Sequence, residues 1–386
     1  MTSQVNVRFF GSTDQGALAV SAPARARDED PGGYVASKAL TDAINAAILL
    51  GQPLLLTGEP GVGKTSVGRA IADQLGLPLL EFTVKSTSRA VDLFYEYDAV
   101  GRFHAAEAER ASAARFEALK KLAPEALEEV KRSARTDQRL DLLNYIRVRA
   151  LGRAILNALP GKDCFPFVAT PEEHRIGGQR YKRDTTPGRW VEEMWEGPEM
   201  QSVVIIDEID KAPSDFCNDL LDELEMMRFQ VPEFTIFSDM GDAPRFGGEL
   251  HPGLRPIVII TSNQERPLPD AFLRRCCYHH IDMPVDEALN AVIESRLGDI
   301  ARVGRDTLKH ALDTFAEIKK LPLAKKPGLA ELLGWLRYIA FHRKEATGDY
   351  HIGKDGEFLG QSLATLIKDP VDLKKAQAWL KTYNPR

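Results

Sequence analysis

GEPGVGKT, at residues 58–65, is the stretch that decides the fold of this chain. It follows an apolar run at residues 53–57 that predicts a short buried strand. Residues 66–72 come next and carry apolar side chains every three or four positions, which predicts a helix. A glycine-rich turn between a strand and a helix favours phosphate binding, because the glycines let successive backbone amides point inward and the helix start adds positive charge. A chance glycine-rich turn is the weaker alternative.

The residues expected to contact the phosphates are those of this turn, here named the phosphate loop, and the position after it: Gly58, Glu59, Pro60, Gly61, Val62, Gly63, Lys64, Thr65 and Ser66. Lys64 is long enough to reach the β- and γ-phosphates of a nucleotide. The hydroxyl of Thr65 suits Mg²⁺, which takes oxygen ligands in an octahedral array.

A second group of polar candidates follows two later apolar runs. A strand is expected at 201–208, where the continuous apolar run 203–206 ends in Asp207 and Glu208, which predicts a parallel strand covered on both faces. The ends of such strands form the ligand-facing edge of the sheet. Asp207 suits Mg²⁺ binding, and Glu208 suits orienting and deprotonating an attacking water. Asn263 ends the strand expected at 256–263 and is a candidate for holding that water or contacting the γ-phosphate.

The other expected elements complete an α/β unit followed by helices. Tyr34 and Val35 precede a helix expected at 37–50, and they are candidates for the wall of a base pocket or, equally, for ordinary core packing. Arg274 and Arg275 end a short helix expected at 268–275. Further strands are expected at 79–84 and 277–283, a hairpin over 230–248, and helices at 102–132, 140–159, 211–227, 287–297, 305–321, 328–343 and 371–383.

These elements divide the 386 residues into three parts. Residues 1–33 are expected to form an N-terminal arm, and residues 285–386 a helical domain. Between them, residues 34–284 form the α/β nucleotide-binding domain, interrupted by an insertion at about 101–200. Residues 101–190 hold 18 Lys and Arg against 12 Asp and Glu, which favours a partner surface, a pore lining or, equally, solvated helix faces and loops.

The amino-acid composition indicates the class of protein and the cellular compartment. The chain is 44% apolar and 27% charged, as in soluble globular proteins, and its net charge of −6 does not indicate nucleic-acid or membrane binding. Its four cysteines lack paired metal spacing, so free thiols of a reducing cytosol are expected: Cys164, Cys217, Cys276 and Cys277. No signal peptide and no membrane segment is visible, and a cytoplasmic location is expected.

Over about residues 34–345 the chain resembles AAA+ ATPases and, within them, the MoxR family. The phosphate loop resembles Walker A, residues 203–208 Walker B, and residues 261–263 sensor 1. Residues 268–275 resemble the segment that ends in the arginine finger. The long insertion after the second strand and the hairpin before sensor 1 resemble the helix-2-insert clade, to which MoxR proteins belong.

The resemblance implies a P-loop NTPase fold, with a parallel sheet in strand order 5-1-4-3-2 and a C-terminal helical lid. It implies a ring, often a hexamer, that hydrolyses ATP with Mg²⁺ and remodels proteins like a chaperone, alongside a von Willebrand factor A domain partner. Arg275 would be the finger offered to the neighbouring subunit, with Arg274 as the rival. Arg275 is preferred because the family's finger more often directly precedes the last strand.

One departure and three alternatives accompany the resemblance. The family's lid arginine, sensor 2, is missing from KKPGLAE at residues 325–331, where Lys326 is a substitute without the bidentate fork. The alternative function is a GTP- or ATP-dependent nucleic-acid-linked motor of the same clade. A small-molecule kinase is disfavoured, because it needs no water-activating Glu208. A non-enzymatic scaffold would be expected to lose Lys64 or Glu208, and both are present.

Overall fold

The computed structural model describes most of the α/β unit and of the helices that follow it. The described residues are 34–104, 107, 145–159, 173–176, 179–183, 190–194, 199–233, 245–248, 250–297, 305–345 and 356–382. The arm expected at 1–33 lies outside them, as do Cys164 and most of the helix expected at 102–132. None of the helices in the described part combines the length and the apolar character needed to cross a bilayer.

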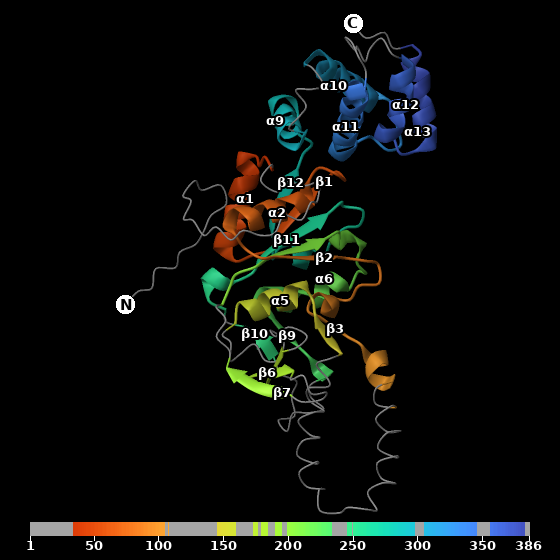
Figure 1. Cartoon of the computed structure of the whole chain (residues 1–386). Helices are drawn as coiled ribbons and strands as arrows, with labels where there is room; N and C mark the ends of the chain where they lie inside the picture. Colours follow the sequence, from red (N-terminus) through yellow and green to blue (C-terminus); the bar gives the residue numbers. More distant parts are fainter. Residues whose placement is uncertain are drawn as a thin grey trace, which may run out of the picture.

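A five-stranded parallel sheet forms the centre of the α/β unit (Figure 1). Its strands are β1 (Leu54–Gly58), β2 (Leu79–Thr83), β8 (Val203–Asp207), β11 (Ile257–Ser262) and β12 (Cys277–Ile281). They lie in the order β12-β1-β11-β8-β2, and every neighbouring pair is parallel. Counted along the chain this is 5-1-4-3-2, so the expected strand order is confirmed.

Helices cover both faces of the sheet, which is why its central strands read as unbroken apolar runs. On one face α1 (Lys38–Leu50) and α2 (Lys64–Leu75) pack over alternate strand residues such as Leu54 and Ile259. On the other face α5 (Ala150–Asn157), α6 (Phe216–Asp219) and α8 (Asp270–Leu273) pack over residues such as Leu55 and Ile260. The carboxyl ends of β1, β8 and β11 therefore emerge between two helical layers.

The helix expected at 211–227 was wrong as a single element. The structure has a 3-10 turn η4 (Ile209–Lys211), then α6, then α7 (Leu221–Met226). Pro213 explains the break, because the residue before a proline is disfavoured in the helical region, and Ala212 has φ −61° and ψ 156°. Met227 ends α7 in the left-handed conformation at φ 46°.

The expected hairpin is present among the described residues but begins earlier. Its strands β9 (Arg228–Gln230) and β10 (Arg245–Gly247) pair antiparallel, with Arg228 opposite Gly247. The turn between these strands cannot be compared with the sequence, because residues 234–244 fall outside the described residues. Two further 3-10 turns, η2 (Ala90–Leu93) and η6 (Pro252–Leu254), connect neighbouring elements.

The insertion contains more strand than its sequence indicated. Within the expected helix 140–159, β4 (Ile146–Val148) pairs with β3 (Tyr95–Tyr97), and α5 starts only at Ala150. Further along the insertion, where the sequence predicted no strand, three antiparallel strands form a small sheet: β5 (Glu173–Ile176), β6 (Gln179–Arg183) and β7 (Trp190–Met194). β-branched Ile146 and Val148 favour the strand that the helical interpretation missed.

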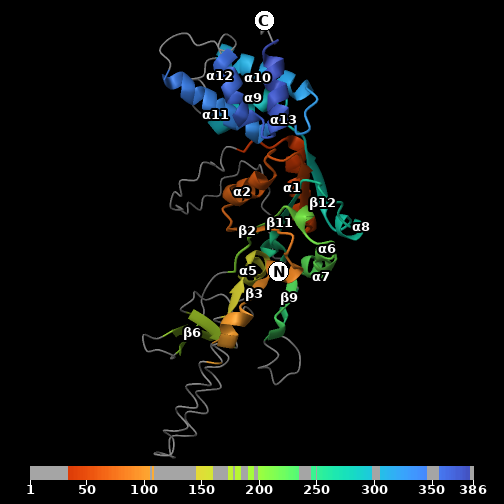
Figure 2. The same cartoon turned by 90° about the vertical axis from the view of Figure 1, so that its right-hand side faces the viewer.

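Among the described residues, five helices follow the sheet and gather at one end of the molecule, beside β12 and β1 (Figures 1 and 2). They are here named the helical region. They are α9 (Asp286–Leu297), α10 (Arg305–Lys320), α11 (Leu329–Glu345), α12 (Gly356–Leu366) and α13 (Pro370–Leu380). Trp335 is fully buried at the centre of their own core and donates a 2.9 Å hydrogen bond to Ser362. Helix α12 was not expected, since two of its residues are glycines of low helix propensity. The division at residue 285 stays a proposal.

Candidate nucleotide-binding and hydrolysis site

The phosphate loop joins β1 to α2 through three glycines in conformations that other residues rarely adopt. The φ angles are 147° at Gly58, 77° at Gly61 and 99° at Gly63. A Cβ atom added to Gly58 would lie 2.4 Å from the carbonyl oxygen of Ile281 on β12. Glycine is therefore required for the backbone to curl in this way beside the neighbouring strand.

Lys64 is buried at the start of α2, and its ammonium group points into the loop. Its Nζ donates hydrogen bonds of 2.8 Å to the carbonyl of Gly58 and 3.0 Å to that of Glu59. Burial lowers the pKa of Lys64, while the carboxylates of Asp210, Asp207 and Glu208 act in the opposite direction. The loop thus holds a cation among backbone carbonyls, with three acids nearby.

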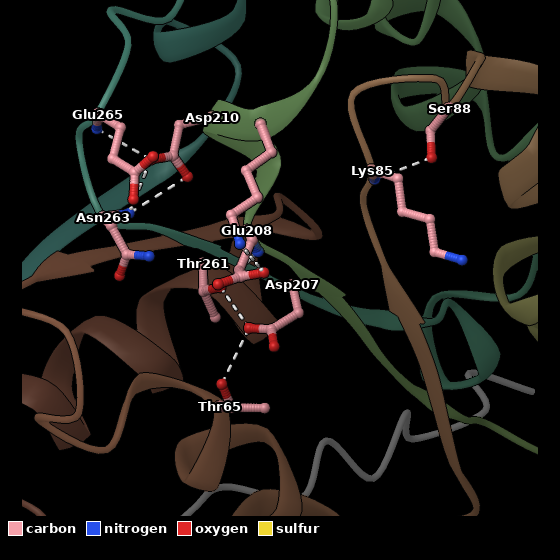
Figure 3. A network of polar contacts seen from close by, with 10 residues as sticks. Thr65, Lys85, Ser88, Asp207, Glu208, Asp210, Thr261, Asn263 and Glu265 are labelled. Atoms are coloured by element: carbon pink, nitrogen blue, oxygen red, sulfur yellow. Dashed lines mark hydrogen bonds and ion pairs between the residues drawn. The ribbon is translucent and has the colours of Figure 1, made fainter. Parts of the chain in front are cut away.

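Thr65, Asp207 and Thr261 form a chain of hydroxyl and carboxylate groups across three elements (Figure 3). Asp207 at the end of β8 accepts through Oδ1 from Thr65 of α2 at 2.9 Å and from Thr261 of β11 at 2.5 Å. The two residues predicted as metal ligands are therefore brought together. Hydroxyl and carboxylate oxygen atoms of this kind are suitable ligands for Mg²⁺.

Glu208 follows Asp207 in a strained conformation that turns the chain after β8. Its φ is 61°, which is uncommon for a residue with a side chain, and its backbone N–H donates 2.9 Å to the hydroxyl of Thr261. Its carboxylate accepts a 2.6 Å hydrogen bond from Nζ of Lys211, and this bond raises the pKa of Lys211. The carboxylate proposed as a base is thus 30% exposed and paired with one lysine of the following turn.

Asp210 holds the turn that carries Asn263, a role that the sequence did not indicate. It is 2% exposed and accepts from the backbone N–H groups of Asn263 at 3.2 Å and Glu265 at 2.9 Å. Figure 3 shows the side-chain amide of Asn263 turned away from Asp210. The amide therefore remains available to a ligand. An acid in a turn gives no sequence signal of such burial.

The two candidates for the base pocket differ in position. Tyr34 packs against the core formed by α1, α2 and the sheet, and its ring lies 3.5 Å from where a Cβ on Gly63 would be. Burial raises the pKa of Tyr34 to about 12. Val35 is 46% exposed. The structure brings Tyr34, rather than Val35, to the phosphate loop.

Arg274 and Arg275 are both exposed after α8, and they differ in their contacts. Arg275 forms a 2.8 Å ion pair with Glu225 and a 3.2 Å hydrogen bond to the carbonyl of Ala271. Arg274 has no polar side-chain partner in the described part of the chain. Arg275, the preferred candidate for the finger, therefore makes its contacts within this chain, through an exposed pair of a kind that contributes only about 0–1 kcal/mol.

The helical region reaches the phosphate loop through residues that the sequence did not single out. A Cβ on Gly61 would lie 2.7 Å from Cβ of Ala330, at the start of α11. Nζ of Lys319, near the end of α10, lies 3.9 Å from Oε2 of Glu59. Lys326, the expected substitute for the lid arginine, is exposed and lacks a polar side-chain contact among the described residues.

The chain matches a known protein family. A family model described as "AAA domain (dynein-related subfamily)" matches residues 53–276, more than half of the chain. No curated protein matches the chain.

The solved structures that are similar to this chain include two of low identity. One is NtrX from Brucella abortus in complex with ADP, at 13% identity and a TM-score of 0.41 over 90% of this chain and 61% of that chain. The other is the RuvB Holliday junction branch migration motor of Thermotoga maritima, at 13% identity and a TM-score of 0.36, covering 90% of this chain and 69% of that one. The chain thus spans less than two thirds of the NtrX chain.

Proposed function

The chain belongs to the family of AAA domains, in the dynein-related subfamily, and on that premise we propose that it is a MoxR-type ATPase whose hydrolysis of ATP drives chaperone-like remodelling of a protein partner. The observation that carries the proposal is the 2.9 Å contact between Thr65 and Asp207. It joins the phosphate loop to the end of β8, directly before the candidate base, Glu208.

The chemistry follows from the placement of these groups. Lys64 would bind the β- and γ-phosphates, and Thr65 and Asp207 would hold Mg²⁺, which when bound neutralises phosphate charge. Glu208 would accept the proton of a water whose oxygen attacks the γ-phosphorus. The bond between that phosphorus and the bridging oxygen then breaks, giving ADP and phosphate. Asn263 is proposed to position the water.

The assembly and the partner follow from the resemblance. We propose a ring, often a hexamer in this family, in which Arg275 or Arg274 of one subunit acts on the nucleotide of the next. The exposure of both side chains supports such a contact. A von Willebrand factor A domain protein is the proposed partner, and the cytoplasm the proposed location.

The test is phosphate release by the purified chain with Mg²⁺ and either ATP or GTP. We expect hydrolysis of ATP and its loss in Lys64→Ala, which removes the cation inside the loop. Lys38→Ala is the matched control, because Lys38 is exposed at the start of α1. Preference for GTP, with stimulation by nucleic acid, would favour the motor alternative. Hydrolysis of neither nucleotide would contradict the proposal.

A further inference from the structure

Lys319 of α10 is a half-buried lysine whose ammonium group lies beside the phosphate loop. Its side chain is 26% exposed, whereas that of the adjacent Lys320 is 69% exposed. Its Nζ lies 5.9 Å from the ring centroid of Phe315 and 3.0 Å from the thioether sulfur of Met283. These apolar contacts hold the side chain along the helical region and direct its charged end towards Glu59.

The ammonium of Lys319 lacks an oxygen acceptor within hydrogen-bond distance among the described residues. An ammonium group has three donors, and a thioether is a weak acceptor. The carboxylate of Glu59 is 3.9 Å away, which is too long for a hydrogen bond. An ammonium group that is partly removed from water in this way is stabilised more strongly by a nearby anion than a fully solvated one is.

The position of Glu59 indicates which part of a nucleotide would supply that anion. Its carbonyl accepts a 3.0 Å hydrogen bond from Lys64. The lysine of a phosphate loop contacts the β- and γ-phosphates, so Glu59 lies at that end of the loop. The contact of Ala330 with Gly61 shows that the helical region already touches the loop there.

We infer that Lys319 is a second phosphate-binding cation of this site, specific for the γ-phosphate. It faces the carboxylate of Glu59 when the γ-phosphate is absent and exchanges that carboxylate for phosphate oxygens when ATP is bound. The exchange ties the helical region to the loop in the ATP state and releases it in the ADP state. This inference rests on the proposed function, because it requires ATP to occupy the phosphate loop.

The experiment is isothermal titration of the full chain with Mg²⁺ and either ADP or the non-hydrolysable ATP analogue adenylyl-imidodiphosphate. In Lys319→Met we expect the affinity for the analogue to fall about tenfold or more, the loss for one hydrogen bond to a charged group. The affinity for ADP should stay within about twofold of wild type. Lys319→Arg should retain most of the affinity for the analogue, because it keeps the charge.

Lys320→Met is the matched control, since it removes the neighbouring lysine and its 2.6 Å pair with Glu317, away from the loop. Glu59→Gln provides a test that leaves Lys319 in place, and it should tighten binding of the analogue relative to ADP. Equal loss of both ligands in Lys319→Met, or loss of neither, would overturn the inference. If wild type binds neither ligand, the proposed function fails, and the inference fails with it.

Discussion

Thr65 on α2 donates a 2.9 Å hydrogen bond to Asp207 at the end of β8, across a separation of 142 residues. The strand order makes this contact possible, because β1, which leads into the phosphate loop, and β8 lie on either side of β11. Two oxygen donors that suit Mg²⁺ are therefore presented together before any ligand binds. The contact makes the proposed metal site testable one residue at a time.

Replacing Thr65 should change the requirement for Mg²⁺. In Thr65→Ala we expect the Mg²⁺ concentration for half-maximal ATP hydrolysis to rise at least about tenfold, since even residues that only orient metal ligands cost about 10–100-fold in affinity. Thr65→Ser keeps the hydroxyl and should stay close to wild type. A Mg²⁺ titration in which Thr65→Ala and Thr65→Ser coincide would remove Thr65 from the metal site.

Lys326 should contribute little to turnover. Its side chain is exposed and lacks a polar contact in the described part of the chain, and exposed lysines gain little from distant charges. We expect Lys326→Ala to lower the rate of ATP hydrolysis less than about tenfold, as judged from interaction energies at exposed sites. A loss as large as that of Lys64→Ala would make Lys326 the lid cation.

Mixing of variant subunits should identify which arginine acts as the finger. Arg275→Ala and Arg274→Ala subunits keep an intact phosphate loop, whereas Lys64→Ala subunits keep an intact finger. A finger contributes on the order of 10³-fold or more to turnover, so the variant that loses it should be nearly inactive alone. It should regain activity when mixed with Lys64→Ala subunits.

The pair with Glu225 makes the comparison between the two arginines informative. If Arg275→Ala hydrolyses ATP normally while Arg274→Ala is inactive, Arg274 is the finger. Arg275 then only forms the ion pair with Glu225 of its own subunit. Inactive Arg275→Ala rings that do not recover on mixing would place Arg275 in the site of its own subunit.

The central sheet could be predicted because its signals are local. Strands covered on both faces read as continuous apolar runs, and the phosphate loop shows its glycines and Lys64 in one segment. Contacts made by pairing of distant strands gave no such signal. Thr261 meets Asp207 because β11 pairs with β8, with Ile260 opposite Ile206. The sequence alone could not show that Asp210 would be buried beneath the turn of Asn263.

Other misses have identifiable physical causes. The proline at 213 was visible, yet the apolar spacing around it favoured a continuous helix, and the break was missed. Helix α12 is held by tertiary packing around Trp335 rather than by its own propensity. The contact between Lys319 and Glu59 joins two regions of the chain, and nothing in either segment indicated it.

Asp372 should make the stability of the helical region depend on pH. It is fully buried, and the backbone N–H of Lys325 and then the ammonium of Lys375 hold its pKa below the usual value of about 3.9. Because the folded pKa is lowered, the stabilisation is present above the usual value and is lost as pH falls through the folded one. Asp372→Asn should therefore lower Tm at pH 7, and the difference from wild type should shrink below about pH 4.

Thermal melts monitored by circular dichroism at pH 7 and at acidic pH would measure this difference. Asp313→Asn on α10 is the matched control, because Asp313 is exposed. A difference between Asp372→Asn and wild type that is the same at both pH values would show that charge is not responsible.

The central claim is that Glu208 is the base for ATP hydrolysis at a phosphate loop that binds ATP independently of it. The most direct measurement follows radiolabelled ATP bound to wild type, Glu208→Gln and the exposed control Glu294→Gln during a single turnover. We predict that Glu208→Gln binds ATP with near wild-type affinity and retains it unhydrolysed, because an amide cannot accept the proton of water. Wild type and Glu294→Gln should release ADP and phosphate. Near wild-type phosphate release by Glu208→Gln would contradict the account.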